Sequence, residues 1–112
     1  MKIHESKNGA LIILTLEGRL DASTSVILEK KFMEILNKGE TCFIFDFNQL
    51  DYISSAGLRI LLMAAKKTKA VGGKIVLSCL KEHVIEVFDI AGFTAIFPIC
   101  SNQDDAVKSF NQ

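Results

Sequence analysis

Two adjacent serines, Ser54 and Ser55, stand between an apolar run and an amphipathic run, and their hydroxyls are the groups here best placed for chemistry. A serine at a helix start faces backbone N–H groups without intrahelical partners, where the helix dipole is positive. A phosphate attached there would be held rather than repelled. The turn is therefore a candidate phosphorylation site, and the alternative is that one serine only caps the helix.

Patterns that would indicate catalysis or nucleotide binding are incomplete. Gly72-Gly73-Lys74 lacks the upstream Gly and the downstream Ser or Thr of a phosphate-binding P-loop. The run from Ser54 to Gly57 is not a Gly-x-Ser-x-Gly elbow, and neither His4 nor His83 has the context of a base that would activate a serine. We therefore expect neither nucleotide binding nor hydrolysis.

The sequence contexts of the remaining aspartates, cysteines and histidines indicate structural or surface roles. Three aspartates could form a catalytic carboxylate pair, but a structural or surface role is favoured for Asp46, Asp51 and Asp89. The cysteines are odd in number and lie in apolar sequence, which is typical of reduced, buried thiols: Cys42, Cys79 and Cys100. The two histidines lie far apart, outside any metal-ligand spacing. We expect no metal and no cofactor.

Composition narrows the class of partner. A length of 112 residues with 49% hydrophobic content suits one compact domain spanning residues 1–112. Thirteen basic residues balance thirteen acidic ones, so the basic field of a nucleic-acid or membrane-surface binder is missing. The N-terminus lacks a signal-like apolar stretch, and the apolar runs are too short to cross a bilayer. We expect a cytoplasmic protein with a protein partner, no nucleic acid and no membrane insertion.

The elements that must position the two serines follow from turn signals and hydrophobic periodicity. Lys2 to Ser6 and Ala10 to Glu17 indicate a hairpin that turns at Asn8-Gly9. The segment Gly18 to Thr24 interrupts the strand pattern. Apolar residues then recur at helical spacing up to Gly39, namely Leu28, Phe32, Ile35 and Leu36. Cys42 to Phe47 is nearly all apolar and is expected to be a central strand covered on both faces.

After the serine turn, the helical spacing of Leu58, Leu61, Leu62 and Ala65 predicts a second helix that stops at Gly72-Gly73. A strand over Lys74 to Cys79 and a third helix ending at Gly92 follow, the latter from the spacing of Val84, Val87, Phe88 and Ala91. We expect at most a brief edge strand at Ile96-Phe97. A closing helix over Asp104 to Phe110 would be capped from Ser101 or Asn102. This order predicts an α/β fold, with a mixed four- to five-stranded sheet and about four helices.

With these elements in order, the chain resembles the STAS domain of the bacterial anti-sigma factor antagonist family nearly from end to end. Three blocks carry the resemblance: Gly18 to Asp21, Asp51 to Leu58 and Phe88 to Phe93. The last block also suits a helix end with its glycine cap, so we do not count it as a site. The resemblance implies a small STAS-type domain that acts as a binding protein and not as an enzyme.

In that family, a partner kinase phosphorylates the serine two residues before the Gly-Leu pair, which here is Ser55. The kinase is itself an anti-sigma factor with a histidine-kinase-like ATPase fold, and a separate serine phosphatase restores the active form. Many members carry aspartate where this chain has Ser54, and Ser or Thr where it has Ala56. Ser54 is therefore either an alternative phosphate acceptor or a helix cap. Phosphorylation is expected to weaken kinase binding with little change of the backbone.

The resemblance also implies a partner-binding surface, with the candidates Asp21, Ser23, Thr24, Ser54, Ser55, Gly57, Leu58 and Arg59. Asp21 or Ser23 could instead cap the first helix. Gly57 suits close packing better than chemistry, Leu58 faces either the core or the partner, and Arg59 is the better exposed candidate.

An alternative function is a STAS subunit of a non-sigma assembly, either a lipid-transport complex or a signalling complex that controls secretion or biofilm behaviour. A small-molecule or nucleotide-binding module is disfavoured, because Gly-rich phosphate loops are nearly absent. We expect a monomer.

Overall fold

The computed structural model describes residues 1–111. The strands are β1 (Lys2–Asn8), β2 (Leu11–Leu20), β3 (Cys42–Ile53), β4 (Lys74–Ser78) and β5 (Ile99–Cys100). The helices are α1 (Ala22–Asn37), α2 (Ser55–Ala70), α3 (Glu82–Ala91), the short 3₁₀ helix η1 (Phe93–Ala95) and α4 (Gln103–Ser109). The five strands form one sheet in the order β1-β2-β3-β4-β5, in which β1 pairs antiparallel with β2 and the other pairs are parallel. The predicted mixed sheet is confirmed.

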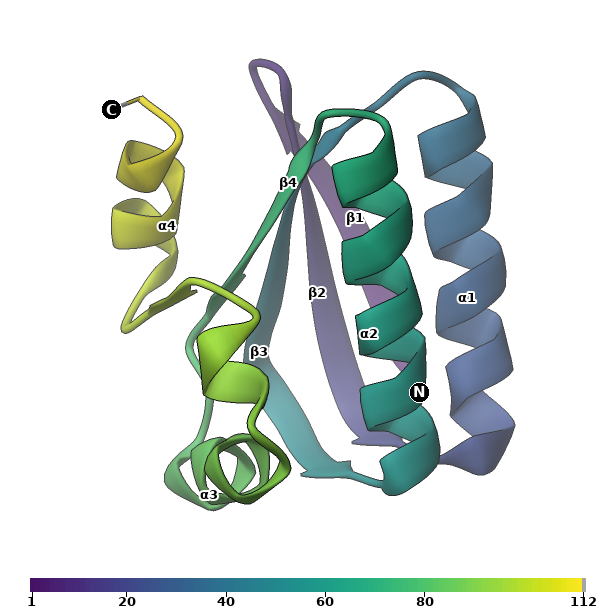
Figure 1. Cartoon of the computed structure of the whole chain (residues 1–112), viewed down its shortest axis with the longest axis vertical. Helices are drawn as coiled ribbons and strands as arrows, with labels where there is room; N and C mark the ends of the chain where they lie inside the picture. The colour runs from purple at the N-terminus through teal and green to yellow at the C-terminus, as the bar shows by residue number, and fades with distance from the viewer. Residues whose placement is uncertain (112) are drawn as a thin grey trace.

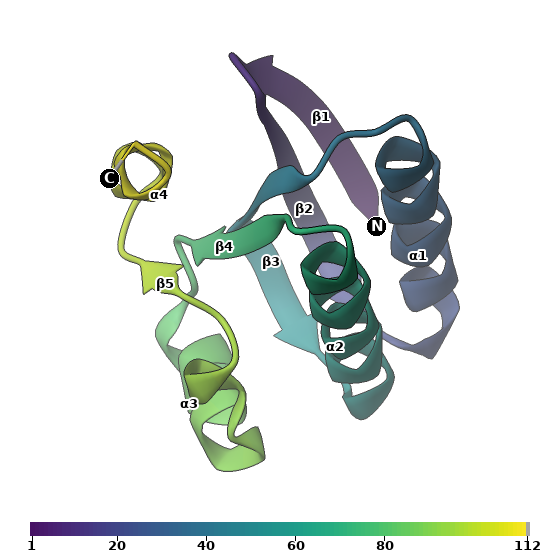
Figure 2. The same cartoon turned by 45° about the horizontal axis from the view of Figure 1, so that its top comes forward.

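The sheet lies between two layers of helices (Figures 1 and 2). α1 and α2 pack side by side on one face, and α4 packs on the other. Side chains of β3 alternate between these layers, so Phe43, Phe45 and Phe47 enter the larger core while Ile44 contacts the α4 side. All residues from Phe43 to Phe47 are buried, which confirms the prediction of a central strand covered on both faces.

Aromatic rings fill the core between β3 and the helices. The rings of Phe32 and Phe43 lie 5.0 Å apart between centroids, and those of Phe47 and Phe88 lie 6.0 Å apart. These side chains come from α1, β3 and α3, so one core holds three elements that are distant in sequence. Burial of large aromatic side chains of this kind is a main source of folding free energy.

β2 and β3 are longer than their apolar patterns predicted. β2 runs on to Leu20, although the strand was expected to end at Glu17, and β3 continues past Phe47 to Ile53. The two strands pair with each other to their last residues, with register shifts near Gly18, whose φ is +106°. Parallel pairing between the two strands thus extends them into polar sequence, where no alternation of apolar and polar residues had predicted a strand.

The hairpin turn is displaced by one residue from its predicted place. Asn8 pairs with Leu11, so Gly9 and Ala10 form the turn, where Asn8-Gly9 had been expected. Gly9 has a φ of +62°, a conformation that costs glycine little because it has no Cβ.

The brief edge strand that the sequence allowed at Ile96-Phe97 does not form at these residues. Gly92 ends α3 in a left-handed conformation, and the chain then coils so that Phe93 and Phe97 are buried beside Phe88. The backbone N–H of Phe97 donates to the Phe93 carbonyl at 3.2 Å, which is helical rather than extended geometry. Aromatic burial therefore overrides strand propensity here, and the short edge strand β5 begins after Pro98.

The sequence predicted the start of α4 more accurately than it predicted which residues of α2 are buried. Asn102 caps α4 as expected, with its side chain accepting from the Asp105 N–H at 2.8 Å. The buried stripe of α2, however, is Gly57, Leu61, Ala64 and Thr68, while Leu58, Leu62 and Ala65 are half-buried. Small residues on this stripe let the helix lie close to the sheet.

The cysteines are free but not fully buried. Cys42, Cys79 and Cys100 are each half-buried, which corrects the expectation of core thiols. Cys42 begins β3, Cys79 directly follows β4 and Cys100 ends β5, so all three lie at strand ends and not in the middle of the sheet.

Candidate functional site

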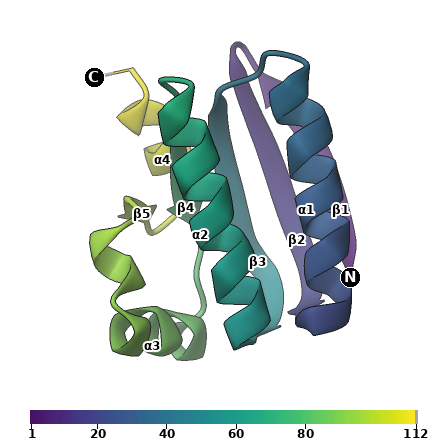
Figure 3. The same ribbon diagram turned by 45° about the vertical axis from the view of Figure 1, so that its right-hand side comes forward.

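α1 and α2 begin at the same end of the sheet, where the parallel strands β2 and β3 finish (Figure 3). The parallel strands β2 and β3 end side by side, with Leu20 paired to Ile53, and each is followed directly by a helix cap. The Ser54 N–H donates to the Leu20 carbonyl at 2.9 Å and so joins the two turns. We call the surface formed by Asp21, Ser23, Thr24, Ser54 and Ser55 the cap edge. The structure brings these five predicted site residues together.

Asp21 and Thr24 form a reciprocal cap at the start of α1. The Asp21 carboxylate accepts from the N–H groups of Ser23 and Thr24, both at 3.1 Å, and the Asp21 N–H donates to Thr24 Oγ1 at 2.8 Å. The Ser23 hydroxyl also donates to this carboxylate at 2.8 Å. That bond, together with the Thr24 N–H, lowers the pKa of Asp21 below its ordinary value. The structure thus makes Asp21 the N-cap of α1, one of the two caps that the sequence allowed, and Thr24 closes the capping box.

The two serines of the α2 turn have different surroundings. Ser54 is the N-cap: it is half-buried, and its hydroxyl accepts from the Gly57 N–H at 3.2 Å. Ser55 is the first residue of the helix, and it is exposed. Of the two hydroxyls, that of Ser55 is open to a partner molecule, whereas that of Ser54 is engaged in the cap.

The next residues of α2 divide between packing and exposure. A Cβ on Gly57 would lie 2.8 Å from the Leu20 carbonyl oxygen, which confirms its expected role in close packing. Leu58 is half-buried against the main core, and Arg59 is exposed one turn from Ser55. Arg59 is therefore the cation of α2 nearest in sequence to the cap edge.

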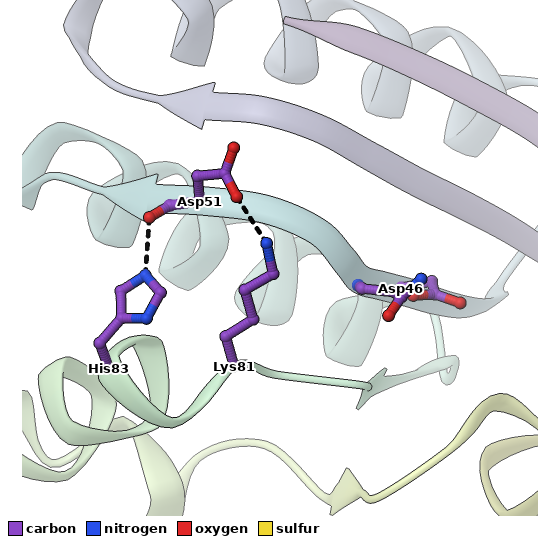
Figure 4. A network of polar contacts seen from close by, with 5 residues as sticks. Asp46, Asp51, Lys81 and His83 are labelled. Atoms are coloured by element: carbon purple, nitrogen blue, oxygen red, sulfur yellow. Dashed lines mark hydrogen bonds and ion pairs between the residues drawn. The ribbon is translucent and has the colours of Figure 1, made fainter.

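Sequence reasoning missed a second polar group beside the cap edge. Lys81 Nζ contacts Asp51 Oδ1 at 2.5 Å, and the His83 ring lies 2.7 Å from the Asp51 carbonyl oxygen (Figure 4). This ion pair lowers the pKa of Asp51. The contacts tie the start of α3 to the end of β3, just before the serine turn. No local signal reveals them, because these residues are about thirty positions apart.

Arg19 and Tyr52 form a further contact at the ends of β2 and β3. The two residues are paired in register, and the Arg19 guanidinium lies 4.1 Å from the centroid of the Tyr52 ring. Tyr52 is 40% exposed, so its ring and the Arg19 cation are both available at the surface. A cation over an aromatic face stabilises the pair modestly at an exposed site.

The other candidate groups lie away from this edge. Asp46 is buried, and its carboxylate accepts from the Asn48 N–H and from Gln103 Nε2, both at 2.8 Å, while Asp89 is exposed. His4 is exposed and contacts Glu17 at 2.9 Å, which lowers the pKa of that carboxyl. Residues 1–111 contain no cluster of three or more potential metal ligands. No helix in the same range is long and apolar enough to cross a membrane.

The cap edge presents the exposed Ser55 hydroxyl at a helix start that is closed by cap hydrogen bonds. A hydroxyl at this position can accept a phosphoryl group from an enzyme that reaches it, and the helix dipole favours the added negative charge.

Comparisons with known proteins agree with this architecture. The family model of the STAS domain matches residues 2–106. BtrV of Bordetella bronchiseptica, described as a candidate anti-sigma factor antagonist, is 40% identical over 110 residues, covering 98% of this chain and 95% of BtrV. A Thermotoga maritima protein, TM1081, described in the same terms, matches with a TM-score of 0.94 at 21% identity, covering 98% of this chain and 95% of its own.

The anti-sigma factor antagonist SpoIIAA of Bacillus is another structural match. Its unphosphorylated form has a TM-score of 0.76 at 18% identity, covering 98% of each chain. Its phosphorylated form has a TM-score of 0.78 at 19% identity, covering 97% of this chain and 99% of SpoIIAA. At these identities the structural matches establish a shared fold.

Proposed function

This chain belongs to the STAS domain family, and we propose that it is an anti-sigma factor antagonist controlled by phosphorylation of Ser55. In this proposal the unphosphorylated protein binds an anti-sigma serine kinase with a histidine-kinase-like ATPase fold. The kinase phosphorylates Ser55 and releases the protein, and a serine phosphatase restores the binding form. The protein acts in the cytoplasm by binding, as a monomer, and not as an enzyme.

The observation that carries the proposal is the exposure of Ser55 at the first position of α2, where the two helix starts meet. Ser54, its neighbour, is half-buried and engaged as the N-cap. These surroundings favour Ser55 as the phosphate acceptor and leave Ser54 as the alternative. The similarity to SpoIIAA, a protein of this fold solved with and without phosphate, supports the same reading.

A phosphate on Ser55 changes the charge of the cap edge more than its shape. Phosphorylation adds about 1.5 to 2 negative charges at neutral pH to a chain whose formal net charge is zero. Asp21 already places one carboxylate at this edge, and its lowered pKa keeps it ionised. A partner that fits the neutral hydroxyl would have to desolvate the phosphate without a cation to receive it, which disfavours binding.

The partner surface includes the exposed cap-edge residue Ser23 and extends along α2 to Arg59. Gly57 and Leu58 contribute to it by setting how closely α2 lies against β2 and the core. Asp21, Ser54 and Thr24 hold the edge in shape through their cap hydrogen bonds.

The test is a pull-down from native lysate with four full-length baits: wild type, Ser55→Ala, Ser55→Asp and Ser6→Asp. Ser6→Asp is the matched control, because it adds the same charge on the exposed strand β1. Wild type, Ser55→Ala and Ser6→Asp should retain a histidine-kinase-like ATPase, and Ser55→Asp should lose it. Incubation of the wild-type complex with ATP should place phosphate on Ser55, located by fragment-ion mass spectrometry.

Retention of the same ATPase by Ser55→Asp, or phosphate on Ser54 in place of Ser55, would contradict the proposed site. Recovery of transport or secretion components without any such ATPase would favour the alternative, a STAS subunit of a non-sigma assembly.

A further inference from the structure

A groove separate from the cap edge runs between the C-terminal half of α2 and the segment that leads from η1 to β5. Figure 3 shows α2 beside this segment, with β4 between them. One wall is formed by Leu62, Ala65, Lys66 and Lys69, and the other by Ile96 and Phe97. Its volume is about 460 Å³, which lies within the range of small-molecule sites in proteins.

The segment from η1 to Phe97 is held toward the Phe88 side of the core, because the Phe93 ring lies 5.9 Å from that of Phe88 and 6.3 Å from that of Phe97. Phe97 is buried there, but Ile96 is left 44% exposed at the mouth of the groove. Leu62 and Ala65 are half-buried on the facing wall. An apolar surface therefore remains open to water in a hollow of the fold, and a concave, mostly apolar lining of this kind is typical of small-molecule sites.

The charges around the groove have one sign. α2 carries Arg59, Lys66, Lys67 and Lys69 and no acidic residue, although the chain as a whole is neutral. Lys66 and Lys69 share the stripe of α2 that faces the groove with Leu62, and no acidic residue lines it. The lysines that form ion pairs within residues 1–111 are others: Lys7, Lys31 and Lys81.

A third lysine at the groove, Lys74, is engaged elsewhere. Its ammonium lies 5.3 Å from the centroid of the Phe110 ring, and Phe110 packs on the opposite, α4 side of the sheet. Lys66 and Lys69 are therefore the two cations available to a molecule in the groove.

We propose that this groove binds a single-chain anionic amphiphile, such as a fatty-acid anion. Its alkyl chain would lie between Leu62 and Ile96, and its head group would lie at Lys66 and Lys69. The apolar walls account for a chain, and the paired lysines account for a negative head group. The site requires neither Ser55 nor the proposed kinase, so it stands independently of the proposed function.

The experiment is an NMR titration of ¹⁵N-labelled full-length protein with sodium laurate below its critical micelle concentration. Amides of Leu62 to Lys69 and of Ala95 to Phe97 should shift together and saturate. Acetate, which has the head group only, and dodecyltrimethylammonium, which has the same chain with the opposite charge, should not reproduce these shifts.

Charge-reversal variants test the role of the lysines. Lys66→Glu/Lys69→Glu should weaken laurate binding roughly tenfold, because two attractive contacts become repulsive. Lys67→Glu is the matched control for each single reversal, Lys66→Glu or Lys69→Glu, because all three change the charge of the same helix by the same amount. Lys67 lies outside the groove, so its reversal should alter the affinity by less than about twofold. Amide spectra of each variant alone establish that it is folded.

Several outcomes would overturn the proposal. They are the absence of saturable shifts with laurate, equal shifts with the cationic amphiphile or with acetate, and shifts confined to another surface such as α1. Groove amides that broaden with protein concentration in the absence of laurate would assign the groove to a second copy of the chain.

Discussion

Gly57→Ala tests how tightly the start of α2 is fitted against the end of β2. A Cβ at this position would lie 2.8 Å from the Leu20 carbonyl oxygen, 2.9 Å from Leu20 Cγ and 2.9 Å from Ile53 Cγ1. These separations are all shorter than 3.0 Å, below which real Cβ atoms are essentially never found, so part of the structure must move. The Leu20 carbonyl oxygen also accepts from the Ser54 N–H, and displacement of α2 would weaken that bond.

Two opposing effects set the size of the change. Inserting a methyl group into a filled space costs about 1 to 3 kcal/mol. Replacing glycine by alanine within a helix recovers up to about 1 kcal/mol. Because one of the contacts is with a backbone atom that has little freedom to rotate away, we expect a net loss of about 1 to 2 kcal/mol. For a chain of this size, the melting temperature would fall by roughly 4 to 8 °C.

Urea denaturation followed by circular dichroism measures this loss. The sign of the change decides the matter, since an unopposed Gly→Ala exchange in a helix stabilises by about 0.4 to 1 kcal/mol. A Gly57→Ala variant more stable than wild type would refute the close approach of α2 to Leu20. In a double-mutant cycle, Leu20→Ala removes one of the three contacted atoms, so the added methyl group should cost less in that background.

Three further predictions concern single side chains. Lys81→Met removes the ammonium that lowers the pKa of Asp51, so that pKa, measured by NMR, should rise toward its ordinary value; an unchanged pKa would contradict the ion pair. Because the pKa is lowered in the folded state, the stabilisation from the pair is present at neutral pH and is lost as the pH falls through the folded-state value. Gln103→Ala removes a donor at 2.8 Å from buried Asp46 and should cost about 1 to 3 kcal/mol in urea denaturation, whereas unchanged stability would mean that the bond is dispensable. Burial raises the pKa of the Cys79 thiol, so iodoacetamide should label it slowly at neutral pH and faster only in alkaline buffer; rapid labelling at neutral pH would contradict this protection.

The alternation of elements could be predicted from the sequence because its signals are local. Helical spacing after Leu28 and Leu58, glycines at helix ends and the apolar run of β3 each act over a few residues. Three helix caps were each predicted to within two candidate residues, because a cap side chain reaches backbone groups only two or three residues away; the structure selects Asp21, Ser54 and Asn102. The order of elements and the position of the serine turn followed from these signals.

Errors arose where a distant segment decides the local conformation. β2 and β3 extend into polar sequence because they pair with each other, and Ile96-Phe97 is not a strand because burial of Phe93 and Phe97 bends the chain. Neither effect is visible in a short window of sequence, since both depend on segments brought together only in the folded chain.

The features of the candidate site likewise fall into those encoded in neighbouring residues and those that depend on distant ones. The sequence by itself determined that the two serines lie between an apolar strand and an amphipathic helix, because the strand and helix patterns are each encoded in neighbouring residues. Only the tertiary structure decided that the α1 and α2 caps share one edge, that Lys81 reaches Asp51, and that an open groove lies beside Lys66 and Lys69. These features depend on parallel strand pairing and on packing between distant segments, and the contacts that create them form only when the whole chain folds.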